Sequence, residues 1–236
     1  MTRPEELRDF AKTWLGRSLT EHDGVEVPAS AVMPQALRDI YLVFGGVEAL
    51  TTAHNRLYPP QGIVISDGYG IFYDENQSVV RWAFRDCDAA ADDPIVYQGT
   101  VTEDGYDWYS EEMPLSAWIR VMCFWQLVNS GYSHSAYSDG IVGATAAVET
   151  SLSHLTTHAD GSTRYYGVPG QLFCLAGPAS IPSVWAGAVS PEAFTSLSQT
   201  LDFDWDYCTD DDAWTVRKGE KAMEPTPVNG AAHLRR

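Results

Sequence analysis

The sequence has little positive charge. Its 236 residues include 15 Lys and Arg against 32 Asp and Glu, which gives a formal net charge of -17. Binding to nucleic acid or to an anionic membrane surface requires a surplus of basic side chains, so the charge argues against both as direct partners. It leaves open a basic protein, a metal ion or a neutral ligand, and it is also compatible with high solubility alone.

Cysteines are few, and long apolar runs are missing. The four cysteines, Cys87, Cys123, Cys174 and Cys208, are widely separated. No run reaches the roughly 18 apolar residues of a membrane-spanning helix. The first ten residues, MTRPEELRDF, lack the apolar core of a signal peptide. We therefore predict reduced thiols and a cytoplasmic location.

The short motifs of several enzyme classes are also absent. The sequence contains no GxxxxGK[ST], no complete GxGxxG, no GxSxG and no HExxH. Carboxylates for glycoside hydrolysis could be drawn from Asp74, Glu75, Asp92 or Asp93, but nothing among 32 acidic residues selects a pair. Cys123 lies in an apolar segment, where a thiol is usually inert. We predict no catalytic residue and no cofactor, with a carboxylate-dependent hydrolase as the less favoured alternative.

Two groups of residues resemble metal ligands in part. His154 and His158 are four residues apart, a spacing that would place both rings on one face of a helix. Zinc needs a third and usually a fourth ligand, and no Cys or acidic neighbour supplies one locally. The run Asp210, Asp211 and Asp212 lacks the alternate spacing and the glycine of a calcium loop. We predict no metal site.

The composition indicates a globular protein with a basic end. Hydrophobic residues make up 44% and charged residues 20% of the chain. Residues 217–236 contain five basic and two acidic side chains, two prolines and no apolar period. We predict one domain over residues 1–216 and a disordered tail over 217–236, which leaves a net charge of -20 on the domain.

Five segments have the features of helices. The predicted helices are Thr2–Arg17, Pro34–Phe44, Leu115–Val128, Val142–Leu155 and a segment capped by Ser190 with Pro191 in its first turn. The pair Gly45-Gly46 is predicted to end the second helix in the left-handed region. The segment from Leu115 is apolar on more than one face, so we expect it to be the most deeply buried.

Short apolar runs between turn residues predict strands. The predicted strands are Ile63–Ile65, Gly70–Tyr73, Val79–Phe84, Ile95–Tyr97, Tyr106–Tyr109, Arg164–Tyr166, Leu172–Ala176 and Val184–Ala188. Two helices, several strands, a helix and a mixed second half predict an α+β fold, with a mainly antiparallel sheet flanked by helices.

Aromatic residues and aspartates alternate between residues 201 and 207. As a strand, the segment would place Phe203, Trp205 and Tyr207 on one face and Asp202, Asp204 and Asp206 on the other. The favoured interpretation is an edge strand whose charges prevent edge-to-edge pairing. The alternative is an acidic stripe, continued by Asp210, Asp211 and Asp212, that binds a basic partner.

Three short motifs follow one another between residues 30 and 130. They are Pro34, Leu37 and Tyr41 with Gly45-Gly46; then Glu75-Asn76-Gln77 with Trp82; and then Asp93-Pro94, with Ile95 where a second proline would stand. In order and spacing, this series resembles the SUKH superfamily. Asp74 to Asn76 can also form a hairpin turn, with amide side chains that bond the nearby backbone, so we interpret the motif residues as fold-defining rather than partner-contacting.

The resemblance implies a SUKH-like, non-enzymatic α+β domain without common catalytic residues. Members include fungal cell-wall regulators and bacterial immunity proteins that neutralise cognate toxins. The resemblance and the acidic charge together predict a protein that binds a basic toxin, for example of the nuclease type. A regulatory or scaffolding adaptor of the same fold is the alternative.

Overall fold

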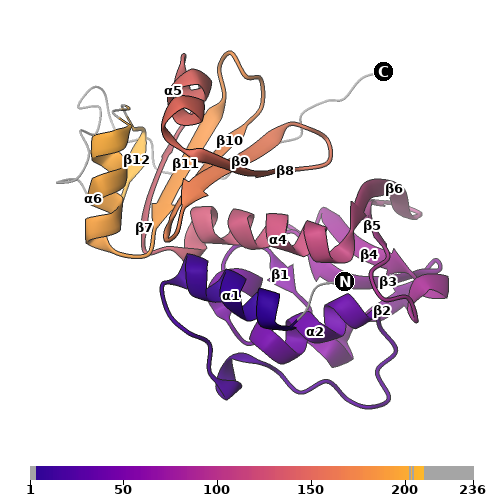
Figure 1. Ribbon diagram of the computed structural model, residues 1–236. Coiled ribbons are helices and arrows are strands. Elements are labelled where there is room, and N and C mark those ends of the chain that lie inside the picture. The colour runs from indigo at the N-terminus through magenta and orange to yellow at the C-terminus, as the bar shows by residue number, and fades with distance from the viewer. Residues whose placement is uncertain (1–3, 202, 204, 210–236) are drawn as a thin grey trace.

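The fold was analysed in a computed structural model that describes residues 4–201, 203 and 205–209 (Figure 1). It contains helices and two six-stranded sheets, which confirms the α+β class. Every described strand pair is antiparallel. The helices are α1 Pro4–Leu15, α2 Gln35–Phe44, α3 Glu48–Thr51, α4 Leu115–Gln126, α5 Ala144–Ser151 and α6 Pro191–Thr200.

The strands divide between the two sheets in chain order. The first sheet consists of β1 Arg56–Leu57, β2 Val64–Ser66, β3 Tyr69–Asp74, β4 Val80–Arg85, β5 Ile95–Thr102 and β6 Gly105–Pro114. Its order is β1-β3-β4-β5-β6, and β2 pairs with β3. The second sheet consists of β7 His134–Ser138, β8 Ser153–Thr157, β9 Thr163–Val168, β10 Gln171–Ala176, β11 Ser183–Ala188 and β12 Tyr207–Cys208. Its order is β12-β7-β11-β10-β9-β8.

Helix α4 lies between the two sheets and contacts both (Figure 1). Trp118 packs on Tyr73 and Trp82 of the first sheet, with ring centroids 5.1 and 5.5 Å apart. Phe124 packs on Tyr165 of the second sheet at 5.6 Å. An amphipathic helix normally buries one stripe, and burial on two sides requires apolar residues around most of the circumference. The prediction of a deeply buried helix here is confirmed.

The second sheet is covered on both faces. Along β10, Leu172 and Cys174 join the core around α4, whereas Phe173 joins a second core. That second core includes Val148 of α5 and Phe194 of α6. Because successive side chains of a strand point to opposite faces, one strand serves both cores.

The segment 91–94 accepts hydrogen bonds from the first turns of two helices, α2 and α4. The Asp93 carboxylate accepts hydrogen bonds from the Ser116 amide (2.8 Å) and hydroxyl (2.6 Å) in the first turn of α4. The Pro94 carbonyl accepts from the amide of Leu115 (2.9 Å), and the Asp92 carbonyl accepts from an amide in the first turn of α2 (2.8 Å). Amides at a helix start have no partner within the helix, so this segment supplies one for both helices.

The end of α2 differs from the prediction. Neither Gly45 nor Gly46 has a positive φ, and Gly45 is right-handed helical with φ -57°. The predicted left-handed stop is therefore wrong. A Cβ at Gly45 would lie 2.8 Å from the Cα and carbonyl oxygen of Tyr41 and 2.8 Å from a methyl of Val25. The glycine is required by close packing and not by its backbone conformation.

The prediction of one helix from Val142 to Leu155 is wrong in its second half. Helix α5 ends at Ser151, and Leu152 has extended backbone angles (φ -128°, ψ 151°). The chain then pairs with β9 as strand β8. The alanines of the first half favour helix, whereas the pairing with β9 determines the structure of the second half.

Candidate functional site

A cleft of about 250 Å³ opens between the two sheets beside α4. It is lined by residues from both halves of the chain: His54, Asn55, Glu75, Trp82, Gln98, Met122, Trp125, His158, Asp160, Thr163 and Tyr165. The β8–β9 hairpin extends over α4 toward the first sheet and contributes the second-sheet residues (Figure 1). A ligand in this cleft would contact residues of the first sheet, of α4 and of the second sheet.

The apolar wall of the cleft is mostly aromatic. Trp82 is 7% exposed, Tyr165 is buried, and Trp125 is half-buried. The indole N–H of Trp82 donates to Oε1 of Glu111 at 2.7 Å, which fixes the ring and satisfies its polar atom. Indole faces carry partial negative charge and attract cations.

A histidine between two carboxylates forms the second-sheet side. Nε2 of His158 lies 3.6 Å from Oε2 of Glu111, and its Nδ1 lies 3.3 Å from Oδ1 of Asp160. Burial alone would raise the pKa of Asp160, but hydrogen bonds from the Ser162 hydroxyl and amide, together with His158, outweigh it and lower that pKa. Asp160 is therefore negatively charged at neutral pH.

The first-sheet side is held by a buried glutamine. Oε1 of Gln126 accepts from the backbone amides of His54 and Asn55, and its Nε2 donates to the Asn55 carbonyl at 2.7 Å. The ring Nε2 of His54 lies 3.2 Å from the side-chain nitrogen of Asn76. Burial lowers the pKa of His54, and the Glu75 carboxylate opposes this effect. His54 is neutral at pH 7 because its pKa lies below the usual value.

The predicted motif residues surround this site or support it. Glu75-Asn76-Gln77 lies in the turn between β3 and β4, where Oε2 of Glu75 accepts from the amide of Gln77 at 2.8 Å. It is the carboxylate, and not the amide side chains, that bonds the local backbone. The amide N–H of Asn76 donates to Oδ1 of Asn55 at 3.2 Å. The motif thus shapes one rim of the cleft, and Glu75 and Trp82 line it.

The opening motif lies away from the cleft. Pro34 precedes the first residue of α2, and Leu37 and Tyr41 are buried on that helix. The hydroxyl of Tyr41 donates to the carbonyl of Tyr58, and burial raises the pKa of this hydroxyl well above its usual range. These side chains, with Asp93 and Pro94, stabilise the helices and contribute no atom to the cleft lining.

Most of the predicted acidic stripe lies outside the described residues: Asp202, Asp204, Asp210, Asp211 and Asp212. Asp206 is described, and its Oδ2 accepts from the Ser138 hydroxyl (2.9 Å) and the Asp139 amide (3.0 Å). Of the described residues in this part of the chain, Trp205 is fully buried and Tyr207 is 56% exposed. Tyr207–Cys208 forms strand β12 at the edge of the second sheet.

The other predicted sites are also placed by the structure. His154 lies in β8 and His158 just after it, so the expected helical face does not exist. The described residues contain no group of three or more His, Cys, Asp or Glu that could hold a metal ion.

The carboxylate and thiol considered as catalytic groups are both buried. Asp74 lies beside Arg56 (3.1 Å) and Arg81 (3.4 Å). The single Asp74 carboxylate thus forms ion pairs with both arginines. Burial raises the pKa of the Cys123 thiol well above its usual range, which keeps this thiol protonated.

Acidic and apolar side chains meet at the end of the first sheet. Asp67, in the turn before β3, and Glu103 and Asp104, in the turn after β5, are exposed. The two turns are close, because a Cβ built on Gly105 would lie 3.4 Å from Oδ2 of Asp67. Val64 and Ile65 in the adjoining edge strand β2 are 56% and 50% exposed. We call this surface, defined by residues 64, 65, 67, 103 and 104, the acidic edge.

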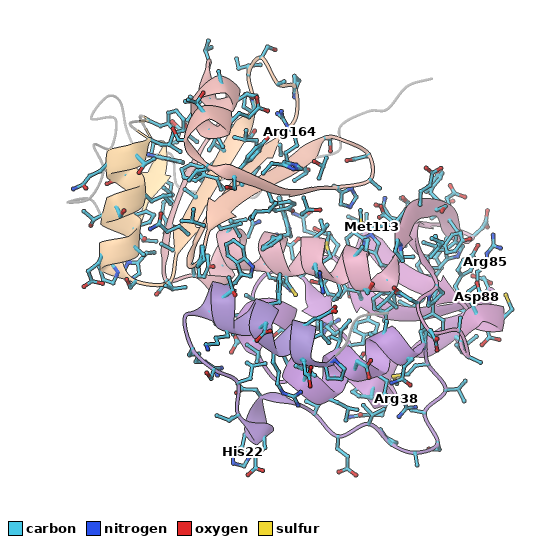
Figure 2. All side chains as sticks on the ribbon, viewed as in Figure 1. His22, Arg38, Arg85, Asp88, Met113 and Arg164 are labelled. Carbon is cyan, nitrogen blue, oxygen red and sulfur yellow. The ribbon has the colours of Figure 1, made fainter. Side chains whose placement is uncertain are left out.

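Beside the acidic edge is a cluster of aromatic rings from β3, β5 and β6. Tyr69 stacks on Trp108 with centroids 4.3 Å apart and also contacts Tyr97 at 5.4 Å. The guanidinium of Arg85 lies 4.7 Å above the Tyr97 ring. Figure 2 shows Arg85 and Asp88 at the same end of the first sheet, away from the second sheet. The aromatic cluster therefore packs next to the acidic edge, since Tyr69 follows Asp67 by two residues.

The chain matches no known protein family, no curated protein and no solved structure. Within the described residues, none of the helices is both long and apolar enough to cross a bilayer.

Proposed function

We propose that this protein is an immunity protein, one that binds a basic toxin domain and blocks the toxin's active site. The observation that supports the proposal is an uncompensated negative surface. The described residues carry 25 acidic and 9 basic side chains. Five of the basic ones lie within 3.6 Å of a carboxylate of the same chain: Arg17, Arg56, Arg81, Arg120 and Arg164. The basic residues are thus largely neutralised internally, and many acidic ones face solvent unpaired.

The acidic edge is the surface on which we place the partner. Exposed Val64 and Ile65 supply apolar area, and Asp67, Glu103 and Asp104 supply charge, in the mixture typical of a protein interface. Complementary charge accelerates the encounter and selects the partner, while the apolar contacts provide most of the affinity. A toxin with a basic substrate groove fits this surface, because carboxylates can occupy the positions that substrate phosphates would take.

The test is a binding and growth experiment with the toxin domain encoded next to this gene. We expect a stable complex and growth rescue when both proteins are expressed together. Association of opposite charges is screened by salt, so the association rate should fall by about tenfold or more between low and high ionic strength. A complex that leaves the toxin active would indicate an adaptor instead, and absence of both complex and rescue would refute the proposal.

Charge-neutral variants test the surface itself. Asp67→Asn, Glu103→Gln and Asp104→Asn combined should slow association, whereas Glu21→Gln, Glu26→Gln and Glu48→Gln remove the same charge from exposed positions elsewhere. If both triple variants slow association equally, the effect belongs to net charge and the acidic edge is not the docking surface.

A further inference from the structure

The cleft between the sheets is lined by aromatic side chains and carboxylates. Among the described residues that line it, none is Lys or Arg. Trp82, Trp125 and Tyr165 form the aromatic part, and Glu75 and Asp160 stand on opposite sides, one from each half of the chain. Only the histidines His54 and His158 could place a positive charge among the lining side chains.

The charge balance of the cleft is negative whichever state its histidines take. Glu75 and Asp160 line the cavity, and Glu111 lies behind Trp82 and 3.6 Å from His158. Protonation of His158 would offset one of these three charges. His54 is held in its neutral form by burial, as described above. At least two negative charges therefore remain in a partly enclosed space, where Coulomb interactions are stronger than in water.

Size and hydrogen-bonding groups narrow the choice of ligand. The volume of about 250 Å³ is below the roughly 300–1,000 Å³ of typical drug-sized sites, so it fits a side chain or a small amine and not a nucleotide. The side-chain amide of Gln98 lines the cleft and makes no hydrogen bond to another described residue. One carboxylate oxygen of Glu75 bonds Gln77, and the other has no hydrogen bond within the described chain.

We propose that this cleft binds a guanidinium group, such as that of an arginine side chain. Guanidinium is planar, stacks on aromatic rings and donates several hydrogen bonds in a fixed plane. The lining offers two tryptophans and a tyrosine together with two carboxylates and an amide. An ammonium group would satisfy the charge but would not use the flat walls. The proposal stands on the cleft alone and rests on the proposed function only for the source of the arginine, which a basic partner would supply.

The experiment is a titration of the full chain with N-acetyl-L-arginine amide, compared with the citrulline and lysine analogues. Citrulline has nearly the same shape without the charge. We expect saturable binding of the arginine compound, at least about tenfold tighter than citrulline and tighter than lysine. NMR of the bound protein should show shifts of the indole N–H signals of Trp82 and Trp125 and of the Gln98 side chain. Equal affinity for citrulline, or shifts that do not involve the cleft, would overturn the proposal.

Paired variants separate the cleft from general charge. Glu75→Gln with Asp160→Asn removes both negative charges, keeps one acceptor oxygen on each residue, and should weaken arginine binding by about tenfold or more. The control, Glu21→Gln with Glu26→Gln, removes the same charge from exposed positions outside the cleft and the acidic edge, and should bind arginine as the wild type does. If the two double variants behave alike, the site is not the cleft. Should the cleft variant fail to fold, the NMR shifts of the wild type decide.

Free L-arginine, compared with the acetylated amide, distinguishes the source of the ligand. Tighter binding of the amide indicates an arginine within a protein, and tighter binding of free arginine indicates a metabolite. Arginine binding without a toxin complex would refute only the proposed function, and a complex without arginine binding would refute only the present inference.

Discussion

At the scale of residues, Gly45 is a glycine because the surrounding atoms leave no space for a side chain. A methyl group there would lie 2.8 Å from backbone atoms of Tyr41 and from Val25, whereas at Gly46 the nearest atom, the Asp23 carbonyl oxygen, is 3.3 Å away. Both glycines have φ values open to other residues. We expect Gly45→Ala to lower the free energy of unfolding by about 1–3 kcal/mol, measured by urea denaturation. Gly46→Ala should cost clearly less, and equal losses would show that packing does not explain the glycine.

Protonation of His54 is expected to make the stability of the protein depend on pH. Its pKa is lowered by burial, so the folded protein binds this proton less readily than the unfolded chain, whose histidine has a pKa near 6.5. This contribution to the unfolding free energy is fully present above about pH 6.5 and is lost progressively as the pH falls from there through the lower pKa of the folded protein. Unfolding free energies measured from pH 7.5 to 5 should decline, and His54→Gln should reduce that decline. A decline that is the same in His54→Gln as in the wild type would contradict this role of His54.

At the scale of elements, α4 depends on a cap from the segment that precedes strand β5. The Asp93 carboxylate accepts hydrogen bonds from the amide and hydroxyl of Ser116. Pro114, which precedes the helix, has no side-chain acceptor that could replace it. We expect Asp93→Ala to lower the unfolding free energy by about 0.5–2 kcal/mol. Asp92→Ala is the matched control, because the exposed Asp92 contributes only its backbone carbonyl to α2. Asp93→Asn should lie between the two, and a loss from Asp92→Ala as large as that from Asp93→Ala would contradict the cap.

Elements with strong local signals could be predicted from the sequence, and those that depend on a partner could not. The apolar period of 35–44 and the Ser190 cap with Pro191 predict α2 and α6 to within a few residues. Strand β8 has little apolar alternation, and its extended state depends on pairing with β9. A hydrophobic period describes the residue's own element, and it carries no information on a pairing partner elsewhere in the chain.

The cleft shows the same limit. Glu75 and Trp82 were selected by their motif, but Gln98, His158 and Asp160 were not, because no local pattern relates them. A helix would place His154 and His158 on one face, but His154 lies in strand β8 and His158 follows that strand. Gln126 would have been the best available signal, since a glutamine in an otherwise apolar helix must find buried partners. Its partners, His54 and Asn55, lie 72 and 71 residues away in sequence and could not be identified without the fold.

At the scale of the whole molecule, α4 makes one folding unit of the two sheets. Its aromatic residues contact both sheets, and β10 connects the core around α4 with the second core beneath α6. Loss of either sheet would expose one side of α4 to water and remove part of the stabilisation of the other sheet. We therefore expect a single cooperative unfolding transition across the described chain.

Substitutions in opposite cores test this coupling. Phe72 belongs to the core between the first sheet and α4, and Phe194 to the core between the second sheet and α6. Phe72→Ala and Phe194→Ala each leave a buried cavity and should cost about 3–5 kcal/mol. Because the unit is shared, each change should lower the hydrogen-exchange protection of β4 and of β10 by the same free energy, since amides in both strands would then exchange through global unfolding. If Phe194→Ala weakened only β10 and left β4 at its wild-type protection, the two sheets would unfold independently, and α4 would be a contact surface between two domains.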